Sequence, residues 1–197
     1  MLAPFVNLFI RLGISPDAVT LVGTLGVSFG AIFFFAQGWV WQGVLFITAF
    51  VFSDLIDGAM ARKAGRTDDF GAFLDSTLDR VADGALFAGL AIWFFAGGDD
   101  VVIAVGAMVC LVLGMVVSYA RAKAESLGFT ANVGIAERAE RLVSVLVVTG
   151  FTGLGLPHIV LQVTLALLAT ASLVTIIQRV ATVRRQSLAE SAASDEG

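Results

Sequence analysis

Residues 54–79 read Asp54-Leu-Ile-Asp57-Gly58-Ala-Met-Ala61-Arg62, then eight residues, then Gly71-Ala-Phe-Leu-Asp75-Ser-Thr-Leu-Asp79. The four aspartates lie in strongly apolar sequence, where a charged side chain costs about 2.5–3.5 kcal/mol on membrane-insertion scales. Spacings of three and four residues place each pair on one face of a helix. Four carboxylates on two neighbouring helices repel one another unless cations neutralise them. The stretch therefore predicts two adjacent helices that share a metal site.

The composition on either side of this stretch is that of a membrane protein. Of 197 residues, 58% are hydrophobic and 14% are charged, and the mean hydropathy is +0.92. A soluble domain would carry about 25% charged residues. The single cysteine, Cys110, lies in an apolar run and permits no disulfide framework. The length and composition indicate one polytopic membrane domain.

The apolar segments predict an all-α fold with six transmembrane helices, since one span takes about 20 mostly apolar residues. The predicted spans cover residues 18–36, 40–61, 70–96, 101–122, 136–151 and 158–180, the last continuing to about 185. Ser15 followed by Pro16 is typical of a helix start. Residues 1–14 are too short to span and predict a short interfacial helix. Residues 15–185 then form the six-helix domain, and the polar residues 186–197 predict a disordered cytoplasmic tail.

The basic residues predict how the bundle is oriented. On the six-span arrangement all twelve Lys and Arg residues fall on one side, and the turns near residues 37–42, 97–100 and 152–157 carry none. Positive charge stays on the cytoplasmic side of a membrane. We therefore expect a multi-pass protein of the cell membrane with both termini and the aspartates at the cytoplasmic face.

The residue types in residues 54–79 suit metal-assisted phosphoryl chemistry. Carboxylate oxygens are typical ligands of Mg²⁺ or Mn²⁺, and four of them suit two ions. Paired metals clamp the attacking and leaving oxygens of a phosphoryl displacement. The small residues Gly58, Ala61 and Gly71 permit close approach of a ligand, and Arg62 is placed to reach a phosphate.

A structural alternative is that the aspartates only pair with nearby cations, namely Arg62, Lys63, Arg66 or Arg80. Four aspartates at this spacing, with small residues between them, favour the metal site instead. Asp83 continues the same face one turn deeper. It is predicted to pair with Arg80 or else to support the metal-binding carboxylates.

The pattern D-x2-D-G-x2-A-R-x8-G-x3-D-x3-D resembles the signature of the CDP-alcohol phosphotransferase family. The resemblance implies an enzyme that uses two metal ions to transfer a phosphatidyl group from CDP-diacylglycerol to an acceptor hydroxyl, releasing CMP. Asp54, Asp57, Asp75 and Asp79 would bind metal, and Asp79 would also act as general base. The same resemblance implies a homodimer among membrane lipids and no nucleic-acid partner. The residues that would bind CDP-diacylglycerol are Asp17, Ala18, Val19, Thr20, Gly58, Ala61, Arg62, Thr67 and Asp68.

The remaining arginines point to a phosphorylated acceptor. Arg121, Arg141 and Arg179 lie near the membrane, where a charge is costly unless it faces a polar cavity. Arginine binds phosphate through two parallel hydrogen bonds from its guanidinium. Lys123 and Arg138 are predicted to be ordinary charges at the cytoplasmic surface, and Arg138 has glutamates nearby that could pair with it. Residues 118–125 and 137–142 resemble the actinobacterial branch whose acceptor is inositol 1-phosphate, with Arg121 in place of the more usual lysine. The resemblance implies that these three arginines bind the acceptor phosphate and that the product is phosphatidylinositol phosphate.

Two alternatives to this function are open at the level of the sequence. A phosphatidylglycerophosphate synthase would use glycerol 3-phosphate, which is also a phosphorylated acceptor. A divalent-cation transporter would need carboxylates near the middle of its spans and a path onward, whereas these aspartates lie toward one side. The intact Asp79 argues against an inactive scaffold.

Overall fold

The protein is described by a computed structural model, which places residues 3–52, 56, 58–60, 63, 69–135 and 137–195. Within these residues the secondary structure is helical and contains no strand, which confirms the all-α prediction. The helices and their bounds are α1 Ala3–Arg11, α2 Pro16–Gly30, the π-helical η1 Ala31–Phe35, α3 Val40–Val51, α5 Asp69–Ala96, α6 Val101–Ser126, α7 Arg138–Gly153 and α8 His158–Asp195.

Local sequence explains where the helices begin. Ser15 caps α2 by accepting a hydrogen bond from the Ala18 amide (3.2 Å), and Pro16 occupies the first turn as predicted. Asp100 caps α6 in the same way through the Ile103 amide (3.1 Å). These caps satisfy amides that have no partner inside the helix.

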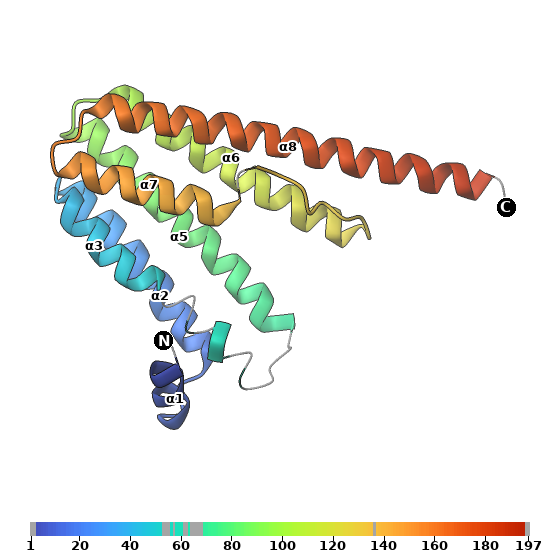
Figure 1. Cartoon of the computed structure of the whole chain (residues 1–197), viewed down its shortest axis with the longest axis horizontal. Helices are drawn as coiled ribbons and strands as arrows, with labels where there is room; N and C mark the ends of the chain where they lie inside the picture. The colour runs from blue at the N-terminus through green and yellow to red at the C-terminus, as the bar shows by residue number, and fades with distance from the viewer. Residues whose placement is uncertain are drawn as a thin grey trace.

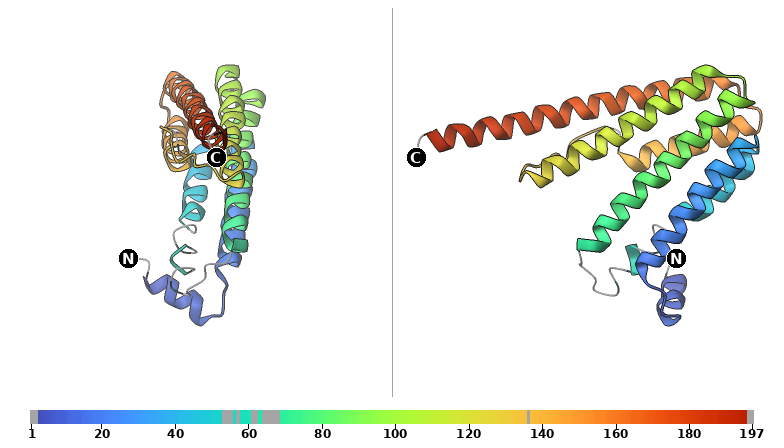
Figure 2. Two further views of the ribbon diagram at one scale, coloured as in Figure 1. Left: turned by 90° about the vertical axis from the view of Figure 1, so that its right-hand side faces the viewer. Right: turned by 180° about the vertical axis from the view of Figure 1, so that it is seen from behind.

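The helices form a fan whose three short turns lie together at one end (Figure 1). Those turns join η1 to α3, α5 to α6 and α7 to α8. The helices separate toward the opposite end, where α1 lies and where α8 projects past its neighbours (Figures 1 and 2). Helix α5 packs between α2 and α6, and α6 packs on α8. The fan thus has a closed end at the turns and an open end where the helices separate.

The apolar core occupies the closed end of the fan. Phe35, Phe87, Leu90 and Phe94 are almost fully buried there. Helix α5 reaches η1 so closely that a Cβ on Gly89 would lie 2.4 Å from the Ala31 carbonyl oxygen. Only glycine permits this contact between the two backbones.

Three helices are long and apolar enough to cross a membrane: residues Pro16–Phe35, Val101–Ser126 and His158–Ala192. Helix α3 is apolar but shorter. Leu21, Leu25 and Phe29 of α2 are among many large apolar side chains that are exposed on the outside of the fan. An outer surface of this kind is stable in lipid and unfavourable in water. The protein is therefore of the integral-membrane type.

Two predicted boundaries differ from the structure. The prediction of a disordered tail over residues 186–197 is wrong for residues 186–195, because α8 continues to Asp195. A helix that is already formed extends without a new nucleation cost, and this segment contains Ala, Leu, Gln and Glu, which favour helix. Helix α3 ends at Val51, whereas the second span was predicted to reach residue 61. Much of the segment that follows α3 lies outside the described residues.

Candidate active site

The site is at the open end of the fan, where α5 carries Asp75 and Asp79 one turn apart on the same face. The Asp75 side chain is exposed, and that of Asp79 is 17% exposed. Their carboxylate oxygens are the donors that Mg²⁺ and Mn²⁺ prefer, so this half of the donor set fits a divalent ion. Within the described part of the chain, no group of three or more metal-ligating side chains comes together.

The rest of the predicted metal site is not placed. Asp54 and Asp57 lie outside the described residues, and so do the predicted nucleotide contacts Ala61, Arg62, Thr67 and Asp68. The four-aspartate ligand set therefore stays a prediction from the sequence.

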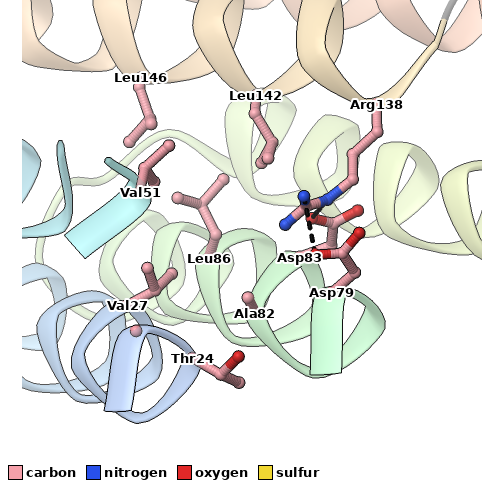
Figure 3. Close-up of a pocket in the computed structure, with 11 residues that line it drawn as sticks. Thr24, Val27, Val51, Asp79, Ala82, Asp83, Leu86, Arg138, Leu142 and Leu146 are labelled. Carbon is pink, nitrogen blue, oxygen red and sulfur yellow. Dashed lines mark hydrogen bonds and ion pairs between the residues drawn. The ribbon is translucent and has the colours of Figure 1, made fainter. Parts of the chain in front are cut away.

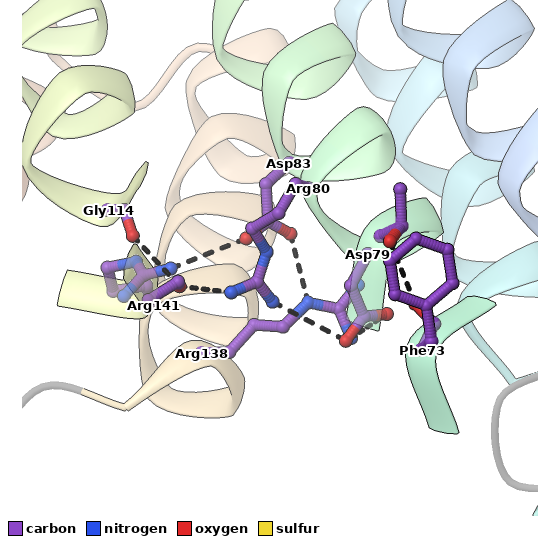
Figure 4. Close-up of polar contacts among 9 residues, drawn as sticks. Phe73, Asp79, Arg80, Asp83, Gly114, Arg138 and Arg141 are labelled. Atoms are coloured by element: carbon purple, nitrogen blue, oxygen red, sulfur yellow. Dashed lines mark hydrogen bonds and ion pairs between the residues drawn. The ribbon is translucent and has the colours of Figure 1, made fainter. Parts of the chain in front are cut away.

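Asp79 lies among arginines (Figure 4). Its Oδ1 is 2.8 Å from Nη1 of Arg138, and its Oδ2 is 3.5 Å from Nη2 of Arg80. Arg80 in turn donates to the Ser118 hydroxyl of α6. Asp79, the predicted general base, is thus paired with cations from both α5 and α7.

Asp83 is the buried centre of this charge cluster, with 4% of its surface exposed. It accepts hydrogen bonds from Nε of Arg138 (3.0 Å) and from Nη2 of Arg141 (3.3 Å). The prediction that Asp83 pairs with Arg80 is therefore wrong. Arg80 turns toward α6, whereas Asp83 lies three residues further along α5 and faces α7. Arg138, which the sequence assigned to ordinary surface charge, instead links Asp79 to Asp83.

Arg141 is almost completely buried, with 2% of its side chain exposed. It fits beneath α6 because residue 114 is glycine: a Cβ there would lie 3.2 Å from Cζ of Arg141. A buried guanidinium is tolerated only when it is paired and hydrogen-bonded, and Asp83 supplies the pairing.

A cavity of about 790 Å³ lies beside this cluster, between α5, α6, α7 and α8. Its charged lining residues are Asp79, Arg80, Arg121, Glu125, Glu137, Arg138, Arg141 and Arg179. The structure thus brings the three predicted acceptor arginines to one cavity and adds Arg80 and Arg138. Sequence spacing gave no signal for those two, because their roles depend on contacts between helices.

The three predicted arginines differ in how freely they can meet a ligand. Arg121 is half exposed and pairs with Glu125 one turn away (2.9 Å). Arg179 is buried, and it donates from Nε to the Val133 carbonyl (3.0 Å) and from Nη1 to the Val117 carbonyl (2.6 Å). These backbone contacts fix the guanidinium of Arg179 in place at the wall of the cavity.

A second, much smaller cavity of about 10 Å³ is lined by Asp79, Asp83 and Arg138 among other residues (Figure 3). Thr24 and Val27 of α2 and Leu142 of α7 are among its lining residues. It has room for about one water molecule. Asp79 and Arg138 line both cavities, so they stand at the boundary between them.

Four of the residues predicted to bind CDP-diacylglycerol, residues 17–20, lie at the start of α2. Val19 and Thr20 are buried there, and Asp17 and Ala18 are more accessible. Val19 shares an apolar cluster with Val6 of α1 and with Met60. Gly58, two residues before Met60, is helical and half-buried. The start of α2 therefore lies next to the segment that carries the first half of the aspartate pattern.

Comparison with known proteins agrees with this geometry. The CDP-alcohol phosphatidyltransferase family model matches residues 13–177. The phosphatidylinositol phosphate synthase of Streptomyces avermitilis is 53% identical over 98% of this chain and 82% of its own length. The corresponding protein of Mycolicibacterium smegmatis is 45% identical over 92% of this chain and 82% of its own length.

Solved structures of a relative have the same fold. The crystal structure of Mycobacterium tuberculosis phosphatidylinositol phosphate synthase with CDP-DAG bound has a TM-score of 0.87 at 38% identity, covering 93% of each chain. A second structure of that protein, in complex with manganese and citrate, has the same TM-score and covers 93% of this chain and 88% of the other. With its aspartate pattern, its fan of helices and these likenesses, the chain belongs to the CDP-alcohol phosphatidyltransferase family.

Proposed function

We propose that the protein transfers the phosphatidyl group of CDP-diacylglycerol to inositol 1-phosphate, giving phosphatidylinositol phosphate and CMP. One observation supports this more than any other: a cavity of about 790 Å³ places five arginines beside Asp79. Such a cavity suits a small acceptor that carries its own phosphate. The relatives named as phosphatidylinositol phosphate synthases support the same acceptor.

In the proposed reaction, Arg121, Arg141 and Arg179 bind the phosphate of inositol 1-phosphate. This places an inositol hydroxyl at Asp79, whose carboxylate accepts the hydroxyl proton. The freed oxygen attacks the phosphorus that carries the diacylglycerol. A new phosphorus–oxygen bond forms, the bond to the CMP phosphate breaks, and CMP leaves with the bonding electrons.

The remaining site residues serve the nucleotide and the metal. Residues 17–20 and Gly58, with Ala61, Arg62, Thr67 and Asp68, bind the cytidine and phosphates of CDP-diacylglycerol. Asp54, Asp57, Asp75 and Asp79 would hold two divalent ions, Mg²⁺ or Mn²⁺. When bound, such ions neutralise phosphate charge and stabilise the leaving group.

The proposal includes the arrangement in the membrane. Six helical segments span the bilayer, α1 lies in its interface, and the open end of the fan faces the cytoplasm together with both termini. Soluble inositol 1-phosphate then reaches the cavity from the cytoplasm, while CDP-diacylglycerol arrives within the leaflet. We expect a homodimer, as the family resemblance implies.

The test is incorporation of labelled acceptor into lipid by the purified protein in vesicles that contain CDP-diacylglycerol. We expect labelled inositol 1-phosphate to enter the lipid fraction with Mg²⁺ or Mn²⁺ and not with EDTA. Incorporation of glycerol 3-phosphate instead would make the protein a phosphatidylglycerophosphate synthase. Movement of a divalent ion into sealed vesicles without lipid product would favour the transporter.

Asp79→Asn tests the proposed base. Asparagine keeps the shape of the side chain but cannot accept the hydroxyl proton, so we expect turnover to fall by a factor of about 10²–10⁴. Binding of CDP-diacylglycerol, measured by its protection against thermal unfolding, should persist. Turnover near that of the unchanged protein would remove Asp79 as the base.

A further inference from the structure

The chain between α6 and α7 runs along α8 and forms hydrogen bonds with three α8 side chains. We name residues 128–135 the connector. Figure 1 shows it running from the far end of α6 back toward the start of α7 beside α8. Thr175, Arg179 and Gln186 of α8 lie at intervals of four and seven residues, which places them on one stripe of the helix.

Gln186 makes the outermost attachment and uses both ends of its amide. Its Oε1 accepts from the Thr130 amide (2.9 Å) and from the Thr130 hydroxyl (3.3 Å), and its Nε2 donates to the Thr130 carbonyl (2.7 Å). One side chain therefore pairs with both backbone groups of one connector residue, as a neighbouring strand would.

The other attachments follow in antiparallel order. Nε of Arg179 donates to the Val133 carbonyl (3.0 Å), and the Thr175 hydroxyl accepts from the Ile135 amide (3.1 Å). From residue 130 to 135 an extended chain rises about 16 Å, and from residue 186 to 175 a helix rises about 16 Å. The two lengths match, so the connector is held extended along α8. Ala131 between the attachments is fully buried.

The connector leads directly into the acceptor cavity. Glu137, Arg138 and Arg141 follow it at the start of α7, and all three line that cavity. Arg179 holds the connector and lines the cavity at the same time. The connector therefore joins Arg179, which it contacts, to the start of α7, where Arg138 and Arg141 lie.

We propose that Gln186 is a positioning residue for the acceptor: by holding Thr130 it keeps the α7 arginines in register with Arg179. The hydrogen bonds of Gln186 go to Thr130 and to the Thr182 carbonyl, and neither of these residues lines the cavity. Gln186 acts through the connector. It affects binding of the acceptor and not of the nucleotide, because the residues proposed to bind the nucleotide lie on α2 and beyond α3. This inference rests on the proposed function.

The first test separates the two substrates. Gln186→Ala removes all the Thr130 contacts, and we expect the KM for inositol 1-phosphate to rise about tenfold. The KM for CDP-diacylglycerol should change less than twofold. The control is Ser187→Ala, at an exposed neighbour on α8, which should behave as the unchanged protein. An unchanged acceptor KM, or an equal rise for both substrates, would overturn the proposal.

The second test follows the connector without using activity. Ala131→Cys places a thiol at a buried connector position, while the native Cys110 is buried in the core. We expect a soluble maleimide to label Cys at position 131 slowly, and about tenfold faster when Gln186→Ala is added. Equal rates would show that Gln186 does not hold the connector. Because labelling needs no substrate, it stands even if the acceptor is not inositol 1-phosphate.

A third variant displaces the connector through a substitution in the connector itself, at Gly134. Gly134 has φ +151, and a Cβ there would lie 2.5 Å from Cγ2 of Thr175. Gly134→Ala should therefore push the connector off α8 and reproduce both the acceptor-selective KM change and the faster labelling. If the labelling rises while the acceptor KM stays unchanged, the position of the connector does not matter to the acceptor and the proposal fails.

Discussion

At the scale of single residues, the site contains a buried cluster of paired charges. Its members are Asp83, Arg138 and Arg141. Arg141 is 2% exposed and Asp83 is 4% exposed, and charges buried to this extent are tolerated only with opposite partners. Arg138 joins this buried pair to Asp79. The proposed base, Asp79, is thus connected to the proposed phosphate ligand, Arg141, through Arg138 and Asp83.

Arg141→Ala is expected to weaken binding of the acceptor more than binding of CDP-diacylglycerol. A charged hydrogen bond contributes about 1.5–3 kcal/mol, so the KM for inositol 1-phosphate should rise about ten- to hundredfold, with a smaller change for CDP-diacylglycerol. Steady-state kinetics with each substrate varied in turn checks this. Lys123→Ala, at an exposed position near the end of α6, is the matched control for loss of one cation. An acceptor KM equal to that of the control would exclude Arg141 from the phosphate site.

At the scale of elements, Asp100 joins two helices at the closed end of the fan. Its Oδ1 caps α6, both its oxygens accept from Nε2 of Gln162 (3.1 and 2.9 Å), and Oδ2 lies 3.0 Å from Nδ1 of His158. Burial raises the pKa of Asp100, but these hydrogen bonds and the nearby His158 outweigh burial. The net result is a pKa below the ordinary value.

Asp100→Asn should therefore lower the thermal midpoint in a pH-dependent way. A carboxyl whose pKa is lowered by folding stabilises the fold above its unfolded pKa of about 3.9, and this stabilisation is lost as the pH falls through the folded pKa. We expect a loss of about 2–4 °C at pH 7, which shrinks below about pH 4. Asp99→Asn, at the exposed neighbour, is the control. A difference that is the same at pH 7 and pH 3 would mean that the charge of Asp100 is not involved.

At the scale of the whole molecule, the described Lys and Arg residues lie away from the three turns at the closed end of the fan. The turn residues 37–39, 97–100 and 154–157 contain no basic residue. This distribution is the basis for the proposed orientation. In the proposed orientation, the open end with Asp79 and the cavity faces the side from which a soluble acceptor would arrive.

Labelling of single cysteines checks that orientation. Leu154 lies in a turn and Glu190 lies on the projecting part of α8, and both are exposed. A membrane-impermeant maleimide added to intact cells should label Leu154→Cys and leave Glu190→Cys unlabelled, and inside-out vesicles should give the reverse. Cys110 is buried and serves as the background. Labelling of Glu190→Cys in intact cells would invert the proposed topology.

Much of the fold follows from the sequence because it depends on local features. Apolar runs of sufficient length, Ser15 before Pro16 and the turns at residues 97–100 all act over a few residues, and the structure places helices accordingly. The continuation of α8 to Asp195 was not predicted. Polar composition predicts disorder for this segment, whereas a helix that already exists can extend through such residues.

The sequence by itself determined that this is an all-helical, membrane-type member of its family, with Asp75 and Asp79 on one helix face, because helical spacing fixes which residues share a face. Only the tertiary structure decided that Arg138 and Arg141 share Asp83 and that Gln186 holds Thr130. These partners are 55 to 58 residues apart in the chain. No local rule relates such distant positions, since their contact depends on how α5, α7 and α8 pack against one another.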